Sequence, residues 1–273
     1  MPFDYGPGSG PLKRSNGRPT TAGARGLRLP VLKGELLLRT KQIYVAAIRK
    51  VGRGLSSRGV GESKPPDRSH RLAHWAYSLT CVHDSLAISK LGVPWWSYTA
   101  IDKVDRWLTS RPHPIRVFEY GSGASTIWLA GRADEVYSVE HHQGFAEYLS
   151  PTLHSLPTAQ LFVVPPTPGA SPKTPSGKEG NENLDFTDYV ATIDQVKGPF
   201  DLIVVDGRAR QACLARAGGR LAADGIIVFD NSGRRRYREA IEGCGLVEKK
   251  FRGLVPTLPY PDQTSILYRV RHP

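Results

Sequence analysis

Short apolar runs alternate with longer amphipathic stretches over the C-terminal two thirds of the chain. Five runs have the length and composition of buried strands, and helical stretches separate them; they are 116–119, 135–140, 160–164, 201–206 and 225–230. Two further runs, 246–252 and 263–270, have only a proline-rich loop between them. Strands that alternate with helices are typical of a doubly wound parallel sheet, and a final pair without a crossover helix is antiparallel. The pattern predicts an α/β fold with a seven-stranded sheet whose last strand is antiparallel.

Apolar positions at steps of three and four residues also precede the first strand. They predict one helix from about 72 to 92 and another over 97–110, so N-terminal helices at 71–110 belong to the folded domain. Trp95 and Trp96 lie between the two helices. Such side chains can line a substrate pocket, but large aromatics usually serve cores. We expect this pair to be packed under an edge of the sheet.

The first 69 residues are predicted to form a basic, mostly disordered arm, and the folded domain covers 70–273. Residues 1–70 hold 14 Lys or Arg against 4 Asp or Glu, an excess of 14 − 4 = +10, whereas the whole chain carries +12. Residues 1–29 lack apolar periodicity, which favours disorder, and 35–51 has the pattern of a basic amphipathic helix. This helix either docks on its own domain or contacts an anionic partner, such as nucleic acid or a peripheral membrane surface.

Cysteine usage and hydropathy indicate the compartment. Cys81, Cys213 and Cys244 are far apart, have no metal-ligand spacing and are odd in number, which favours a reducing compartment. No run approaches the roughly 18 apolar residues of a transmembrane segment, and no signal-peptide pattern opens the sequence. We therefore expect a soluble, cytoplasmic protein.

A glycine-rich turn joins the first predicted strand to the following helix. Gly121 and Gly123 in this turn let the backbone approach a ligand closely, and the helix N-terminus offers free N–H groups. A dinucleotide-binding fingerprint has a third glycine or an alanine where Thr126 stands, which disfavours NAD. Glu140 ends the next strand, 140 − 121 = 19 residues later. It can accept hydrogen bonds from ribose hydroxyls, or it is a solvated carboxylate at a strand end.

These residues resemble the motifs of a known enzyme family. Glu119-Tyr120-Gly121-Ser122-Gly123 is similar to the first motif of class I S-adenosylmethionine (SAM)-dependent methyltransferases, and 137–140 is similar to their acidic second-strand motif. Residues 200–207 and 225–231 resemble the fourth and fifth strands, so the resemblance covers about 115–270. It implies a Rossmann-like fold in which SAM lies over the carboxyl ends of the strands. The cofactor-binding residues that it implies are Glu119, Gly121, Ser122, Gly123, Glu140, His141 and Asp206.

Two acids and an amide end neighbouring strands of the predicted sheet. Asp206, Asp230 and Asn231 offer hard oxygen ligands of the kind that Mg²⁺ or another divalent cation prefers. The arrangement resembles the metal site of catechol and caffeoyl-CoA type O-methyltransferases, in which the cation binds the substrate hydroxyl. Metal-free methyltransferases also place acids here, and Asp-Asn can cap a helix. Two hypotheses therefore stay open: a metal site formed by these residues, or Asp206 as the catalytic general base.

Basic and polar residues follow the strands at the same edge. Arginines there can bind a carboxylate or phosphate of a substrate, or they form a solvated helix face. Tyr260, in the proline-rich loop before the last strand, can contact the acceptor. The candidate substrate-binding residues are Arg208, Arg210, Asn231, Arg234 and Tyr260. The insertion at 165–183 is a candidate lid.

The resemblance implies a SAM-dependent methyltransferase, a transferase of class EC 2.1.1. We expect O-methylation of a small or medium hydroxylated acceptor. An RNA methyltransferase that uses the basic arm is an alternative, although the chain has no Asn-Pro-Pro-Tyr or Asp-Pro-Pro-Tyr signature. A non-catalytic SAM-binding scaffold is the other alternative, and the intact cofactor motifs argue against it.

Overall fold

The computed structural model describes residues 64–81 and 85–270. The chain divides into two units, 1–63 and 64–273, and each described residue belongs to the second. Residues 1–63 of the predicted basic arm, including the helix at 35–51, lie outside the described residues. None of the described helices is long and apolar enough to span a membrane.

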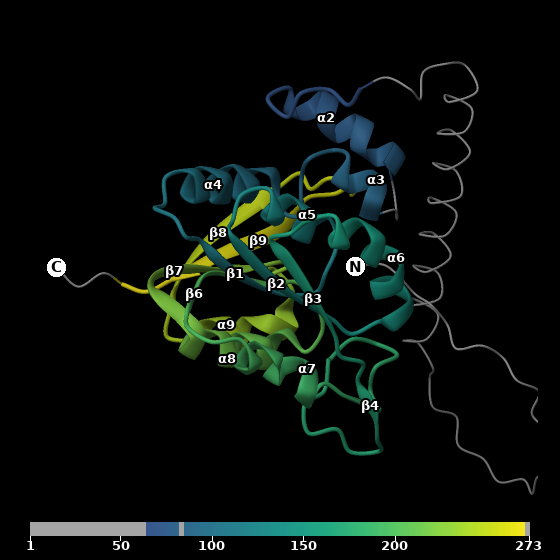
Figure 1. The fold of residues 1–273 in the computed structure, drawn as a ribbon, viewed down its shortest axis with the longest axis vertical. Coiled ribbons are helices and arrows are strands. Elements are labelled where there is room, and N and C mark those ends of the chain that lie inside the picture. Colours follow the sequence, from purple (N-terminus) through teal and green to yellow (C-terminus); the bar gives the residue numbers. More distant parts are fainter. Residues whose placement is uncertain (1–63, 82–84, 271–273) are drawn as a thin grey trace, which may run out of the picture. The chain divides into compact units, whose positions relative to one another are not determined.

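Seven strands form one sheet in the order β3-β2-β1-β6-β7-β9-β8 (Figure 1). Neighbouring strands are parallel except that β9 is antiparallel to both β7 and β8. The predicted seven-stranded, Rossmann-like sheet with an antiparallel last strand is confirmed. The strands are β1 (Arg116–Tyr120), β2 (Glu135–Glu140), β3 (Ala159–Val163), β6 (Phe200–Val205), β7 (Leu221–Phe229), β8 (Val247–Gly253) and β9 (Asp262–Tyr268).

Helices cover both faces of the sheet (Figure 1). Side chains alternate between the two faces along each strand, so Val117 packs with one helical layer and Phe118 with the other. The first layer holds α3 (Ser85–Ser89), α4 (Tyr98–Thr109) and α5 (Ala124–Ala130), and the second holds α7 (Thr187–Ala191), α8 (Arg210–Arg220) and α9 (Arg238–Glu242). Because both faces are buried, the central strands consist mainly of apolar residues.

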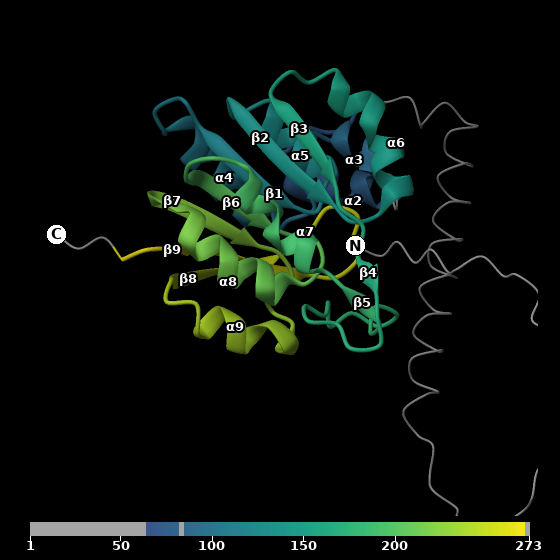
Figure 2. The same cartoon turned by 60° about the horizontal axis from the view of Figure 1, so that its bottom comes forward.

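The remaining elements lie at the ends of these layers. Helix α6 (Gln143–His154) contacts β3 and β2. The candidate lid insertion at 165–183 contains the short strand β4 (Thr167–Pro168). It pairs with β5 (Leu184–Asp185), which follows the insertion, beside α7 (Figure 2).

The predicted single helix from 72 to 92 is wrong in one respect, because two shorter helices occupy this range. Helix α2 (Arg71–Ser78) ends in a 3₁₀ turn at Leu79–Cys81, and α3 is separate. The hydroxyl of Ser78 donates to the carbonyl of Trp75, and that of Thr80 donates to the carbonyl of Tyr77, both at 2.7 Å. Side-chain hydroxyls that bond the carbonyls of the last turn compete with the helical hydrogen bonds and favour an end there.

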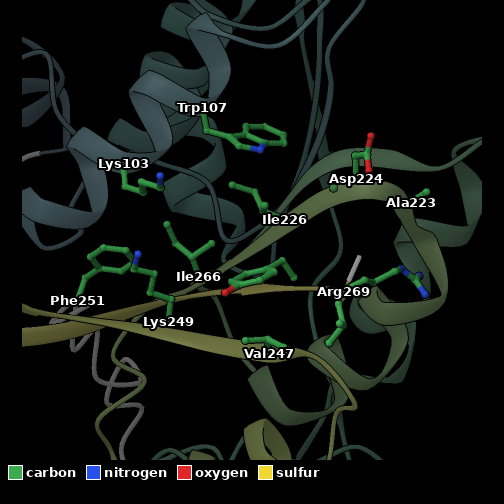
Figure 3. Close-up of a pocket in the computed structure, with 13 residues that line it drawn as sticks. Lys103, Trp107, Ala223, Asp224, Ile226, Val247, Lys249, Phe251, Ile266 and Arg269 are labelled. Carbon is green, nitrogen blue, oxygen red and sulfur yellow. The ribbon is translucent and has the colours of Figure 1, made fainter. Parts of the chain in front are cut away.

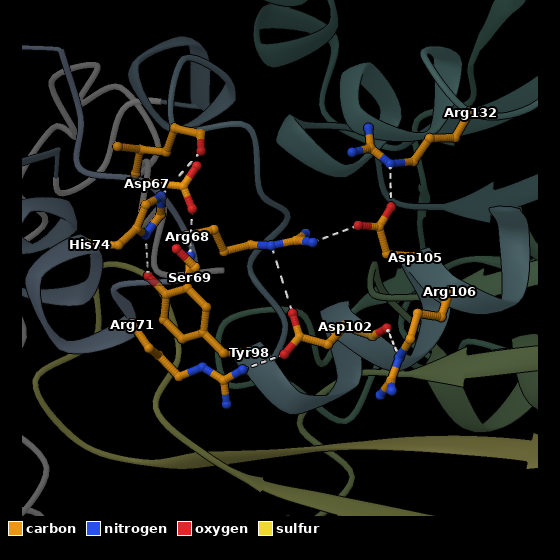
Figure 4. Close-up of polar contacts among 11 residues, drawn as sticks. Asp67, Arg68, Ser69, Arg71, His74, Tyr98, Asp102, Asp105, Arg106 and Arg132 are labelled. Carbon is orange, nitrogen blue, oxygen red and sulfur yellow. Dashed lines mark hydrogen bonds and ion pairs between the residues drawn. The ribbon is translucent and has the colours of Figure 1, made fainter.

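A network of charged side chains fastens the segment before α2 to the first helical layer (Figure 4). Arg68 Nη2 lies 2.5 Å from Asp105 Oδ2, and Arg132 Nε lies 2.8 Å from Asp105 Oδ1. Arg71 pairs with Asp102. The chain before the sheet is thereby tied to α4 and to the turn after α5, so the N-terminal helices form part of the same domain.

The adjacent tryptophans have the packing role that the sequence predicted. Trp96 is fully buried, and its ring meets that of Trp128 edge-on at 5.8 Å between centroids. Trp95 is half-buried, and its indole N–H donates to Thr257 Oγ1 at 3.0 Å. Both side chains therefore support the layer of α4 and α5.

Candidate functional site

The parallel strands of the sheet end together at one edge. The N–H of Gly121 donates to the carbonyl of Val139 at 2.9 Å, and that of Asp206 donates to Tyr120 at 3.0 Å. These bonds extend the ladder one step past the strand ends. The residues that follow β1, β6 and β7 are therefore held side by side, as the sequence spacing predicted.

The turn after β1 is packed directly against the residue after Asp206. Gly121 has φ +99°, a conformation that favours glycine. A Cβ on Gly121 would lie 2.7 Å from Gly207 Cα, and a Cβ on Gly207 would lie 2.0 Å from the hydroxyl of Tyr189. Both glycines are thus required by close approach of the backbone at this edge.

Glu119 lies fully buried beneath the glycine turn. Its carboxylate accepts hydrogen bonds from Ser125, from Thr126 Oγ1 at 2.5 Å and from Ser138 Oγ at 3.0 Å. Thr126 Oγ1 in turn accepts the N–H of Gly123 at 2.9 Å. Burial raises the pKa of Glu119 to about 7, against the opposing effect of the three hydroxyl donors.

The Glu119 network explains a residue that sequence reasoning missed. Thr126 was read only as a departure from the NAD fingerprint, but its hydroxyl links the carboxylate of Glu119 to the turn. The signal was available in the sequence as two hydroxyl residues, Ser125 and Thr126, in the first turn of α5. Glu119 therefore supports the turn from below.

Glu140 is 1% exposed, so it is not a solvated carboxylate at a strand end. Oε1 accepts the N–H groups of His141 at 2.9 Å and His142 at 2.8 Å, and Oε2 accepts the N–H of Ser122 at 3.2 Å. The imidazole Nδ1 of His141 lies 2.7 Å from Oε1. Burial alone would raise the pKa of Glu140, but the hydrogen bond and charge of His141, with the backbone donors, hold it below its ordinary value.

Arg210 joins the ends of β6 and β7 and is 2% exposed. Its guanidinium donates to Asp206 Oδ1 at 2.7 Å, to the carbonyl of Asp206 at 2.6 Å, to that of Asp230 at 2.5 Å and to that of Gly207 at 3.1 Å. Four of its N–H groups are thus used within the protein. This geometry favours a role in holding the strand ends over the substrate contact that the sequence suggested.

Asp230 and Asn231 lie next to this ion pair. Burial and the negative charge of Asp206 raise the pKa of Asp230 to about 7. Its Oδ1 accepts from Thr264 Oγ1 at 2.8 Å. Asn231 Nδ2 donates to Asp262 Oδ2 at 3.0 Å, and Asn231 Oδ1 is buried without a partner.

The corner formed by Asp206, Asp230 and Asn231 does not offer a set of oxygen ligands that fits a divalent cation well. The guanidinium of Arg210 already occupies one oxygen of Asp206 and supplies positive charge between the strand ends. Within 64–81 and 85–270, no group of three or more His, Cys, Asp or Glu residues is placed to hold a metal ion. The corner is better described as two coupled carboxylates with one buried arginine.

The other candidate substrate residues differ in exposure. Arg208 is 8% exposed and its Nε has no hydrogen-bond partner. Arg234 is exposed, and Tyr260 is 50% exposed. The structure thus brings Arg208 into the buried edge with Asp206, whereas the side chains of Arg234 and Tyr260 face solvent.

Aromatic residues cover this edge. The rings of Phe186 and Tyr189 each lie 6.0 Å from that of His141, and both residues are fully buried. Sequence reasoning missed this pair, which follows the candidate lid directly. Its signal was a run of aromatics between the insertion and the fourth strand.

Two cavities in the described structure lie elsewhere. One, of about 580 Å³, lies between α4 and strands β7, β8 and β9, with Trp107 and Lys103 facing Ile226 and Ile266 (Figure 3). The other, of about 620 Å³, lies between α6 and β3. Neither is lined by a predicted site residue.

Comparisons with solved structures find similar folds. An rRNA methylase from Streptococcus thermophilus has a TM-score of 0.45 at 13% identity, over 62% of this chain and 95% of that chain. A TehB-like SAM-dependent methyltransferase from Corynebacterium glutamicum has a TM-score of 0.42 at 17% identity, over 71% and 99%. The N-methyltransferase NodS from Bradyrhizobium japonicum has a TM-score of 0.41 at 13% identity, over 62% and 96%.

No protein-family model matches the chain, and no curated protein matches it either. At the identities above, likeness to solved structures concerns the fold alone. The strand order, with β9 antiparallel between β7 and β8, gives the seven-stranded Rossmann-like sheet that the sequence predicted.

Proposed function

We propose that this protein is a SAM-dependent methyltransferase that methylates an oxygen of a small or medium-sized hydroxylated acceptor. One observation carries the proposal. The N–H of Ser122, in the glycine turn, is hydrogen-bonded to Glu140 at the end of the next strand. This joins the two motifs that a SAM site requires, at the carboxyl edge where ligands of open α/β sheets bind.

The proposed cofactor contacts follow from this edge. The turn of Gly121, Ser122 and Gly123 would face the methionine moiety, and Glu140 with His141 would face the ribose. Glu119 would act from beneath the turn, since its oxygens are bound by hydroxyl groups of the protein. The hydroxyl of Tyr189, whose ring packs with those of His141 and Phe186, lies next to Gly207 at this edge.

When bound, SAM supplies a methyl group on a positively charged sulfur. The residues of this chain would orient the acceptor oxygen for in-line attack and remove its proton. Asp206 is one candidate base, and Asp230 is a second. The pKa of about 7 at Asp230 suits proton abstraction near neutral pH, whereas one oxygen of Asp206 is bound by Arg210.

Isothermal titration with S-adenosylhomocysteine (SAH), SAM and NAD tests the proposal. We expect SAM and SAH to bind and NAD not to bind. Glu140→Ala should weaken SAH binding about ten- to hundredfold, because each hydrogen bond to a charged group contributes about 1.5–3 kcal/mol. The matched control is Glu147→Ala, since Glu147 is exposed on α6.

His141→Ala provides a second variant in case Glu140→Ala does not fold, and the thermal unfolding of each variant is measured alongside. A wild-type protein that binds neither SAM nor SAH would contradict the proposal. Tight SAH binding without methyl transfer to any of a panel of hydroxylated acceptors would favour the scaffold hypothesis.

The excess of +10 in residues 1–70 supports RNA methylation as the second candidate. Binding through such a segment would weaken steeply with salt, because released counterions contribute to the affinity. If the protein does not bind RNA, or if its RNA binding does not depend on salt, a small acceptor remains the better proposal.

A further inference from the structure

Arg208 is a largely buried arginine whose Nε has no hydrogen-bond partner. The residue is 8% exposed, and its Nε is fully buried. Among the residues that the structure describes, none accepts a hydrogen bond from its guanidinium or forms an ion pair with it. A buried guanidinium is normally paired, because an uncompensated charge in the interior is costly.

The surroundings of Arg208 do not compensate this charge. The neighbouring cation Arg210 disfavours it, and burial together with Arg210 lowers the pKa of Arg208. Glu140 lies within electrostatic range, but its carboxylate is already bound by three backbone N–H groups and by His141. Burial raises the pKa of Tyr189, which is also within range, so this side chain is neutral at physiological pH.

The main chain of Arg208 is fixed in place. Its carbonyl accepts the thiol of Cys213 on α8 at 3.3 Å, and the preceding Gly207 is packed against Gly121. The backbone of Arg208 is therefore held beside the end of β6, next to the proposed cofactor turn, and its guanidinium lies within electrostatic range of Glu140. Arg210, of the same residue type and two positions later, is fully bonded within the protein.

We propose that the guanidinium of Arg208 binds a carboxylate or phosphate group of a ligand at the carboxyl edge of the sheet. Arginine matches both oxyanions with paired N–H groups. The ligand is either an anionic acceptor or the methionine carboxylate of the cofactor. The inference rests on the proposed function for the identity of these ligands, but the anion site itself does not.

The experiment uses the full chain as wild type, Arg208→Met and Arg208→Lys. Arg106→Met is the control, because Arg106 is exposed on α4. Isothermal titration measures SAH and its decarboxylated analogue, 5′-(3-aminopropyl)thioadenosine. Inorganic phosphate and benzoate are then titrated into protein saturated with SAH, and also into protein without it, at an ionic strength fixed with sodium chloride.

We expect Arg208→Met to weaken binding of the anion about ten- to hundredfold, and Arg208→Lys to weaken it less. If Arg208→Met loses affinity for SAH but not for the decarboxylated analogue, the anion site belongs to the cofactor. If it loses affinity for phosphate or benzoate in the presence of SAH, the anion site belongs to the acceptor. Without ligand, Arg208→Met should unfold at or above the wild-type temperature, since it removes an unpaired buried charge.

The inference fails if Arg208→Met binds SAH, phosphate and benzoate with wild-type affinity. It also fails if the wild type binds none of these anions and the decarboxylated analogue binds as tightly as SAH. A protein that binds phosphate or benzoate through Arg208 but not SAH would keep the anion site and lose the proposed function. SAH binding that depends neither on Arg208 nor on the carboxylate, together with no Arg208-dependent binding of phosphate or benzoate, would keep the proposed function and remove the anion site.

Discussion

Gly121 and Gly207 face each other so closely that a methyl group on Gly121 would lie 2.7 Å from Gly207 Cα. The two residues follow neighbouring parallel strands, β1 and β6, which pair up to Tyr120 and Val205. Their contact brings the proposed cofactor turn against the segment that carries Asp206 and Arg208. The geometry of the whole edge therefore depends on two positions without side chains.

Gly121→Ala should destabilise the protein by about 2–4 kcal/mol, from the strained φ and from overpacking against backbone that cannot yield. Urea unfolding measures this change. Gly131→Ala is the control, because a Cβ there meets its nearest atom at 3.8 Å and φ is −83°. If Gly121→Ala lowers the free energy of unfolding no more than Gly131→Ala does, the close packing of Gly121 is contradicted.

Glu119→Gln should flatten the dependence of stability on pH. The folded pKa of about 7 lies above the ordinary 4.5, so the folded state binds more protons between these values. The contribution of Glu119 is fully present below pH 4.5 and is lost as pH rises to about 7, a change of about 3 kcal/mol. Urea unfolding from pH 5 to pH 8 should show a smaller fall for the variant than for the wild type.

The control for this titration is Glu147→Gln, on the exposed face of α6. The stability of this variant should change with pH as that of the wild type does. Both should include the loss of stability that comes from ionisation of Asp230, whose pKa is also raised. Parallel curves for wild type and Glu119→Gln would mean that Glu119 is ionised throughout this range.

Arg210→Met should be strongly destabilising. The substitution leaves the buried carboxylate of Asp206 without its cation and three carbonyl groups without that donor, a loss of about 3–5 kcal/mol by analogy with broken buried pairs. Arg216→Met, on the exposed side of the same helix, removes a surface pair with Asp194 and should cost less than about 1 kcal/mol. Equal effects of the two substitutions would show that Arg210 does not fasten the strand ends.

Mg²⁺ should not bind at the corner of Asp206, Asp230 and Asn231, because the guanidinium of Arg210 already neutralises part of the negative charge of the carboxylates there. Titration calorimetry with MgCl₂, in the presence and absence of SAH, measures this directly. Binding at micromolar concentration that disappears in Asp230→Asn would restore the metal hypothesis drawn from the sequence.

The periodicity of the chain was sufficient to predict the sheet. Strands buried on both faces are continuous apolar runs, and this signal is local. The interruption of the helix after Ser78 was not predicted, because apolar spacing continues across it while the hydroxyls of Ser78 and Thr80 end the hydrogen-bond ladder. Strand β7 likewise begins at Leu221, before the apolar run that marked it, because Leu221 pairs with Phe200 across a register shift.

The sequence by itself determined which residues reach the carboxyl edge, since each follows a strand whose end is marked by glycine or by acid. Only the tertiary structure decided which of them are satisfied there. Arg208 and Arg210 are arginines two positions apart, yet the guanidinium of Arg210 makes four hydrogen bonds between two strand ends, whereas the buried Nε of Arg208 makes none. That difference depends on where backbone carbonyls and carboxylates from distant segments lie once the strands pair, and no local pattern encodes it.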